Sequence, residues 1–453
     1  MEKFFELRER GSDVRTEVMA GITTFMTMAY ILAVNPIILG ATGMDSGAIF
    51  TATALISGLA TCFMAFVANM PLALSAGMGL NAYFAYTVVL TMGYTWEQAL
   101  AAVFVEGIIF IFLSLINIRE AIFNAIPPTL KIAVSVGIGF FIAFLGLQSA
   151  HIVVDGPTLV TLFSFRKSLE TGTFATEGIT ALLALIGILI MAFLVIKQVK
   201  GAILWGILLT WMLGMLCQLV GIYVPNPAQG YFDLFPMGIV ALPASLSPTL
   251  LQLDFSSLMT FNFVTVLLAF LFVDLFDTLG TVIGCASRAN LLTADGRLPQ
   301  IKRVLLADAI GTTAGALAGT STVTTFVESS SGIAEGGKTG LTALTVAVLF
   351  LLALFLSPIF LAIPAFATAP ALVIVGFLML QQVGKIDWMG SPTEAIPSFI
   401  TIFAMPFMYS ISEGICFGII SYTILNFLAG KTDKLSPLMY ILAIVFVLRY
   451  IYL

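Results

Sequence analysis

Apolar segments follow one another along almost the whole chain, and most are about as long as a membrane-spanning helix, roughly 20 residues. Only 9% of the 453 residues are charged and 60% are hydrophobic, whereas charged residues make up about a quarter of an ordinary soluble domain. A soluble fold cannot hide so much apolar surface. The chain is therefore predicted to be an all-α polytopic membrane protein.

The apolar segments predict fourteen spanning helices. These occupy residues 17–39, 47–69, 72–91, 96–116, 130–150, 176–197, 201–221, 261–284, 303–319, 322–337, 339–357, 366–384, 394–410 and 412–429. Residues 435–453 form one more apolar run, where Pro437 and Arg449 favour an interfacial helix over a fifteenth span. Fourteen divides into seven plus seven, and repeats with an odd number of spans must be inverted relative to each other in the membrane.

Basic residues predict the orientation. With the N-terminus inside, sixteen lysines and arginines fall on the cytoplasmic side and two, Arg166 and Lys167, fall outside. Positive charge gathers in cytoplasmic loops, so both termini are predicted to be cytoplasmic. The predicted parts are a cytoplasmic N-terminal tail (1–16), a first seven-helix repeat (17–221), an extracytoplasmic connection (222–260), a second seven-helix repeat (261–429) and a C-terminal segment (430–453).

The third predicted span of each repeat is interrupted by small and polar residues. These segments are "MPLALSAGMGLNAYFAY" (Met70–Tyr86) and "AGTSTVTTFVESSSGIAEGG" (Ala318–Gly337). Each predicts a short extended piece followed by a half-helix. Transporters with inverted repeats hold their substrates near the membrane midplane with such interrupted helices. Broken helices 3 and 10 are therefore the expected place of a binding site.

Five acidic residues inside the predicted spans need an account, because a charged group is costly there: Glu106, Asp274, Asp277, Asp308 and Glu328. Asp274 and Thr281 stand about one helical turn on either side of Asp277, so these three residues share one helix face. Glu328 stands just before the second half-helix, whose free N–H groups and positive dipole end point into the same space. Asp277 and Glu328 are therefore the favoured ligands of a substrate.

The remaining acids have simpler interpretations. Asp308 is close in sequence to the basic pair at 302–303, which favours a structural ion pair. Glu106 lies in the middle of "AAVFVEGIIFIF" and is expected to be a packing carboxyl that binds a neighbouring broken segment. Glu335 is near enough to Lys338 to pair with it.

Enzymatic chemistry is not expected, because the sequence contains no Walker A motif, GxSxG elbow or HExxH pair. The single histidine, His151, falls in a predicted outside loop, so neither a metal site nor a cofactor is predicted. Asp277 and Glu328 leave an intramembrane aspartyl protease open as an alternative. An ion channel is a further alternative, although it does not require inverted broken helices. Transport driven by a coupled ion is favoured.

Several sequence blocks resemble one family. "DTLGT" (Asp277–Thr281) and "TTFVESSSG" (Thr324–Gly332) are similar to the helix-eight and helix-ten motifs of the nucleobase:cation symporter-2 superfamily. Blocks at Gly21–Pro36, Ser75–Thr87 and Phe272–Thr281 resemble its AzgA-like branch, the permeases for adenine, guanine and hypoxanthine. The resemblance implies a fourteen-helix fold with a core domain (helices 1–4 and 8–11), a gate domain (helices 5–7 and 12–14) and a homodimer.

The resemblance also implies roles for single residues. Asp277 matches the helix-eight carboxylate that binds the base, and Glu328 matches the helix-ten carboxylate. The other expected substrate-binding residues are Asn81, Thr281, Ser329, Gly79, Phe326 and Thr27. Uracil-type permeases have a histidine or an acid where Thr281 stands, and many have asparagine at the place of Ser329. These differences favour the purine branch.

The chemistry of a purine suits these residues, because its N–H donors form charge-assisted hydrogen bonds with carboxylates. Two charged carboxylates in one dry pocket repel each other, so Asp277, Glu328 or Asp274 is predicted to carry the coupling proton. Sodium is an alternative coupling ion.

The sequence therefore predicts a proton-coupled purine importer that favours guanine and hypoxanthine over adenine. A transporter of xanthine or uracil, or a sulphate-type anion transporter of the same fold, is the alternative. The expected location is a cell membrane, the inner membrane of a bacterium, and no nucleic-acid partner is expected.

Overall fold

The computed structural model describes residues 2–116, 127–156, 159–226, 230–257, 260–289, 291 and 298–452. The longer helices are α1 (Val14–Met28), α2 (Ile31–Gly40), α3 (Ser46–Val67), α5 (Trp96–Leu115), α7 (Pro128–Ser149), α9 (Ile179–Ile196), α10 (Ala202–Leu219), α11 (Phe261–Arg288), α12 (Ile301–Ala318), α14 (Gly340–Ala353), α16 (Ala365–Leu380), α17 (Pro392–Phe407), α18 (Ile411–Leu428) and α19 (Pro437–Tyr452). Shorter helices are α4 (Met78–Ala82), the π-helix η1 (Tyr83–Thr91), α8 (Phe165–Thr171), η2 (Phe174–Gly178), α13 (Ser329–Ala334), η4 (Leu354–Leu356), α15 (Ser357–Ala362), η5 (Gln381–Lys385) and η6 (Thr432–Lys434). The strands are β1 (Leu74–Ala76), β2 (Val153–Gly156), β3 (Leu159–Leu162) and β4 (Val323–Thr325).

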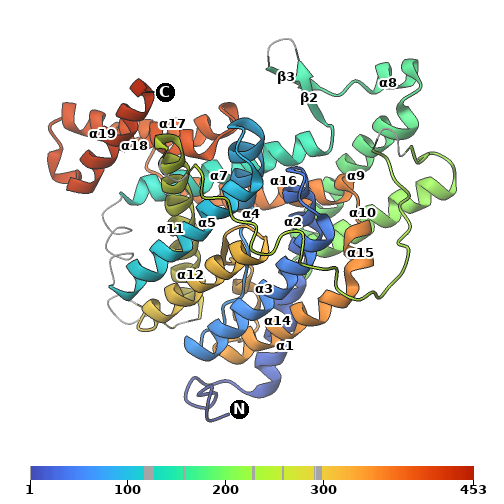
Figure 1. Cartoon of the computed structure of the whole chain (residues 1–453), viewed down its shortest axis with the longest axis horizontal. Helices are drawn as coiled ribbons and strands as arrows, with labels where there is room; N and C mark the ends of the chain where they lie inside the picture. The colour runs from blue at the N-terminus through green and yellow to red at the C-terminus, as the bar shows by residue number, and fades with distance from the viewer. Residues whose placement is uncertain are drawn as a thin grey trace.

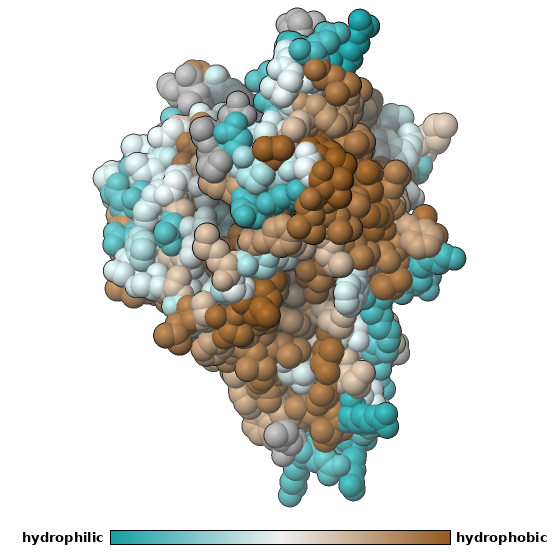
Figure 2. Space-filling view, turned by 90° about the vertical axis from the view of Figure 1, so that its right-hand side faces the viewer, coloured by the Kyte–Doolittle hydropathy of each residue, from teal (hydrophilic) through white to brown (hydrophobic). Residues whose placement is uncertain are grey.

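The predicted class, a helical polytopic membrane protein, is confirmed. Within the described residues, ten helical segments are long and apolar enough to cross a membrane. Apolar residues cover a large part of the face in Figure 2, and hydrophilic residues gather at its upper and lower ends. The count of fourteen spans and the 7+7 repeat stay predictions, because some predicted spans, such as α17 with 16 residues, are shorter than these ten.

Side chains at the helix ends explain several boundaries. Asp45 accepts a hydrogen bond from the Ala48 N–H and begins α3, and Thr95 and Gln98 form a capping box at the start of α5. Such caps satisfy backbone N–H groups that have no partner within the helix.

The first predicted span is divided into α1 and α2 by a tight turn at Ala29 and Tyr30. Leu32 N–H bonds to the Ala29 carbonyl and Ala33 N–H to the Tyr30 carbonyl, three residues back instead of four. The turn places Tyr30 in the middle of the span, where the regular α-helical hydrogen bonding is interrupted.

Both interrupted segments have the predicted form, a short extended piece followed by a half-helix. β1 leads into α4, and β4 is followed by α13. The two strands pair with each other in antiparallel fashion, with Ser75 opposite Thr324. The pairing brings residues about 250 positions apart in sequence into one two-stranded ladder inside the helical protein.

The helices pack in two neighbouring groups around this ladder. In one group, α12 and α14 both pack on α3, α1 packs on α14, and α5 packs on α12. In the other, α7 packs against α16 and α17, and α9 and α10 pack against α16. α11 contacts both α5 and α7, so it lies where the two groups meet (Figure 1).

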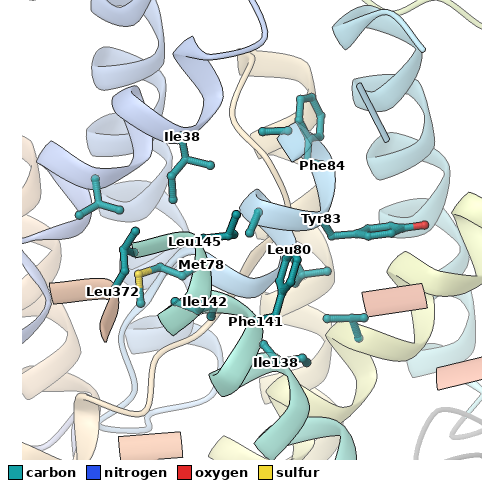
Figure 3. Close-up of a cluster of buried hydrophobic side chains, with 14 of the residues drawn as sticks. Ile38, Met78, Leu80, Tyr83, Phe84, Ile138, Phe141, Ile142, Leu145 and Leu372 are labelled. Carbon is teal, nitrogen blue, oxygen red and sulfur yellow. The ribbon is translucent and has the colours of Figure 1, made fainter. Parts of the chain in front are cut away.

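An apolar cluster joins the half-helix α4 to α7. Figure 3 shows side chains from α2, α4, η1, α7 and α16 directed toward one another, including Ile38, Leu80, Phe141 and Leu372. All four are buried. A Cβ on Gly79 would lie 2.8 Å from Cγ2 of Ile138, so the close approach of α4 to α7 requires glycine at this position.

Candidate functional site

A cavity of about 520 Å³ lies where the two half-helices face α1, α7 and α11. Its volume is in the range of small-molecule sites, roughly 300–1,000 Å³. The wall combines neutral polar groups with apolar groups such as Met78 and Ile142. Asp277 of α11 and Glu328, which directly precedes α13, also line it.

Each of these two carboxylates has one oxygen held by a hydroxyl of the protein. Tyr30 Oη donates to Glu328 Oε1 at 2.7 Å, and Thr324 Oγ1 donates to Asp277 Oδ2 at 3.3 Å. Among the described residues, no hydrogen bond is formed by the second oxygen of either carboxylate. These oxygens are left as hydrogen-bond acceptors for a ligand in the cavity.

The backbone of the ladder places Thr324 against Asp277. Gly77 N–H bonds to the Thr322 carbonyl at 3.0 Å, one residue beyond the strand. A Cβ on Gly77 would lie 3.0 Å from Thr324 Oγ1 and 3.2 Å from its Cγ2. The absence of a side chain at Gly77 therefore leaves the space in which Thr324 reaches the carboxylate.

Six of the residues expected in the site line the cavity. They are Glu328, Asp277, Thr281, Gly79, Phe326 and Thr27. They come from α1, from the half-helix α4, from α11 and from the segment between β4 and α13. The neighbouring hydroxyls Ser330 and Ser331 also line the cavity, although the sequence prediction named Ser329 instead.

Three other predicted residues are fully buried and are not among the lining residues. Asn81 donates through Nδ2 to Asn35 Oδ1 at 2.6 Å, and Ser329 Oγ accepts from the Ala73 N–H at 3.0 Å. Asp274 accepts from Thr278 Oγ1 at 2.9 Å. The first two contacts join different elements behind the wall of the cavity, and the Asp274–Thr278 bond lies within α11.

Two further acids bind the broken segment from behind. Glu106 accepts from Thr322 Oγ1 at 2.9 Å, so the prediction that it binds a neighbouring broken segment is confirmed. Asp308 accepts from Thr278 Oγ1 at 3.0 Å and from the Thr325 N–H at 3.2 Å. The sequence did not predict the bond to Thr325, which ties α12 to β4.

An ion pair stands at the border of the cavity. Lys200 Nζ lies 2.6 Å from Glu335 Oε2, and both residues belong to the cavity lining. The prediction that Glu335 pairs with Lys338 was wrong, because the Lys338 ammonium is instead directed to the Gly11 carbonyl, at 3.5 Å. The Lys200–Glu335 pair connects the α9–α10 turn to the end of α13.

Tyr30 is the site residue that sequence reasoning missed. It lies inside the quoted block Gly21–Pro36, but an aromatic residue in a membrane helix is most often a packing residue. Its bond to Glu328 joins positions 298 apart in sequence, and no local pattern signals such a contact. Within the described residues there is no group of three or more side chains that could hold a metal ion.

Comparisons with known proteins identify the family of the chain. The sequence model of the Permease family (Xan_ur_permease) matches residues 15–437. The guanine/hypoxanthine permease PbuG of Bacillus subtilis is 42% identical over 465 residues, with 100% of both chains covered. The adenine permease AdeP of Escherichia coli is 38% identical over 454 residues, covering 100% of this chain and 96% of its own.

Among solved structures, the transmembrane domain of the cyanobacterial bicarbonate transporter BicA aligns with a TM-score of 0.64. It covers 88% of this chain and 96% of its own at 18% identity, so this likeness shows the fold alone. The family match and the two permeases show the family as well, because these similarities extend over nearly the whole sequence. The chain is therefore a member of the nucleobase:cation symporter-2 family, a multi-pass membrane transporter and not an enzyme.

Proposed function

We propose that this permease imports purine bases by proton symport, with guanine and hypoxanthine favoured over adenine. The observation that carries the proposal is the cavity in which Asp277 and Glu328 each present a carboxylate oxygen without a protein donor. A purine supplies N–H donors on both its six-membered and its five-membered ring. Charge-assisted bonds from two such edges would fix a flat ring between the two carboxylates.

Apolar surface around the carboxylates supports a ring as the ligand. Phe326, Met78 and Ile138 line the same cavity, and they can cover the faces of a base while its edges meet polar groups. Thr27, Thr281 and the backbone at Gly79 supply further hydrogen-bonding groups around the edge of the cavity. In this proposal Asn81 and Ser329 act by holding the half-helices in place, through Asn35 and the Ala73 N–H.

Proton coupling follows from the two acids. Two carboxylates that share a partly apolar cavity repel each other when both are charged. A proton that enters with the base removes this repulsion, and Asp277 or Glu328 is its proposed carrier, with Asp274 behind them. A sodium ion is the alternative means of neutralising the charge.

The proposal extends to the architecture. We place the chain in a cell membrane, that of a bacterium by analogy with its relatives, with both termini cytoplasmic and fourteen spans in two inverted repeats. The core domain carries the two broken helices and the gate domain contains α7, α9, α10 and α16–α18. The Lys200–Glu335 pair then marks the cytoplasmic mouth of the cavity, and the functional unit is a homodimer.

Uptake into proteoliposomes tests the proposal. Labelled guanine and hypoxanthine should accumulate when the outside is acidic, a protonophore should abolish accumulation, and purine influx should alkalinise the outside medium. Glu328→Gln should abolish uptake while the protein remains inserted, because an amide loses the charge-assisted bond. Uptake that follows a sodium gradient and ignores a pH gradient would refute proton coupling. Uptake of sulphate, xanthine or uracil in preference to guanine, hypoxanthine and adenine would refute the proposed substrate.

A further inference from the structure

Tyr30 holds an unusual place beside the site. It stands at the turn between α1 and α2 and is 1% exposed, yet it lines the cavity. Its carbonyl accepts from the N–H groups of Ala33 and Val34. The backbone is therefore held by the start of α2 while the hydroxyl is directed to Glu328 Oε1, 2.7 Å away.

This bond changes what Glu328 can offer to a base. A free carboxylate presents two oxygens side by side and can accept a pair of parallel N–H donors. Here Oε1 already accepts a short hydroxyl bond, so Oε2 is the better acceptor for a ligand. A base that presents one N–H to Glu328 keeps the tyrosine bond intact, whereas a base that presents two adjacent N–H groups must share or displace it.

Guanine and hypoxanthine differ in this respect. Hypoxanthine has one N–H donor, at N1, on the edge of its six-membered ring. Guanine adds the 2-amino group and presents two adjacent donors. We propose that Tyr30 is a specificity-determining residue: by occupying Oε1 of Glu328, it biases the permease toward hypoxanthine and against the paired donors of guanine. The inference rests on the proposed function, because it requires that Glu328 binds the base.

The test is Tyr30→Phe, which keeps the ring and removes the hydroxyl. The measurement is inhibition of labelled hypoxanthine uptake by unlabelled guanine, compared with unlabelled hypoxanthine. In the variant, the affinity for guanine should rise relative to that for hypoxanthine by about tenfold, the size expected from one hydrogen bond to a charged group. Tyr83→Phe is the matched control, because Tyr83 is equally buried in η1 and is not among the lining residues. This control should leave the ratio unchanged.

Each outcome separates the proposals. An unchanged ratio in Tyr30→Phe, with both bases still transported, would show that Tyr30 only packs and would overturn the inference. A ratio that moves against guanine would also overturn it, because Tyr30 would then be a direct ligand of the 2-amino group. If Tyr30→Phe fails to insert, Tyr30→Leu, which has no side-chain hydrogen-bond donor, is measured for the same ratio. A wild-type protein that transports neither base would instead refute the proposed function.

Discussion

At the scale of single residues, two aspartates one turn apart on α11 have different surroundings. Asp277 lines the cavity, whereas Asp274 is fully buried and accepts from Thr278. Asparagine at position 274 keeps a side-chain oxygen that can accept from Thr278. Asparagine at position 277 removes the negative charge that is proposed to bind the substrate. Asp277→Asn should reduce purine uptake by about a hundredfold, and Asp274→Asn should retain at least about a tenth of it.

Uptake of labelled hypoxanthine, normalised to the inserted protein, measures both aspartate variants. Thermal unfolding in detergent controls for damage to the fold at the buried position. The opposite ranking would mean that the substrate carboxylate is Asp274 and that the motif acts one turn away from Asp277.

At the scale of elements, the ladder of β1 and β4 requires a glycine where α4 begins. Ala at position 77 would press on the Thr324 side chain, whose hydroxyl donates to Asp277. Gly77→Ala is therefore expected to raise the KM for purine several-fold, with a smaller change in maximal rate. Gly280→Ala is the control, because a Cβ there meets nothing within 4 Å among the described residues. Equal KM values in the two variants would contradict this role of the ladder.

At the scale of the whole molecule, one ion pair joins the two helix groups beside the cavity, at its proposed mouth. Lys200 and Glu335 are partly exposed, with 57% and 36% of their side chains accessible, so their pair contributes little to stability. Lys200→Gln should leave the unfolding temperature nearly unchanged. It should alter the maximal rate of uptake by less than about fivefold, because a partly exposed pair can bias the opening of the mouth only weakly.

The exchanged variant, with Lys200→Glu and Glu335→Lys together, should restore the wild-type rate if the pair acts by bridging. Added salt should mimic Lys200→Gln in the wild-type protein, because salt screens exposed charges. A rate that falls equally in the single and the exchanged variant would show that these side chains act separately.

The sequence alone determined the class of the protein, the positions of most helices and the two broken segments. It also pointed to Asp277 and Glu328, because a carboxylate in an apolar span is costly wherever the chain folds. These features depend on residues close together in sequence, on the length of apolar runs, on small residues and on local spacing. Thr27, Gly79 and Thr281 could be named before their contacts were known because they lie in sequence blocks that resemble those of the family.

Tertiary structure alone decided which groups meet. The pairing of β1 with β4, the bond from Tyr30 to Glu328 and the Lys200–Glu335 pair join distant positions. Asn81 and Ser329 share a motif with residues of the site, yet they face Asn35 and Ala73 behind it. Which face of a short half-helix meets the cavity depends on how all the helices around it pack, because a half-helix is too short to bury a face of its own. Packing of that kind has no counterpart in the local pattern of the sequence.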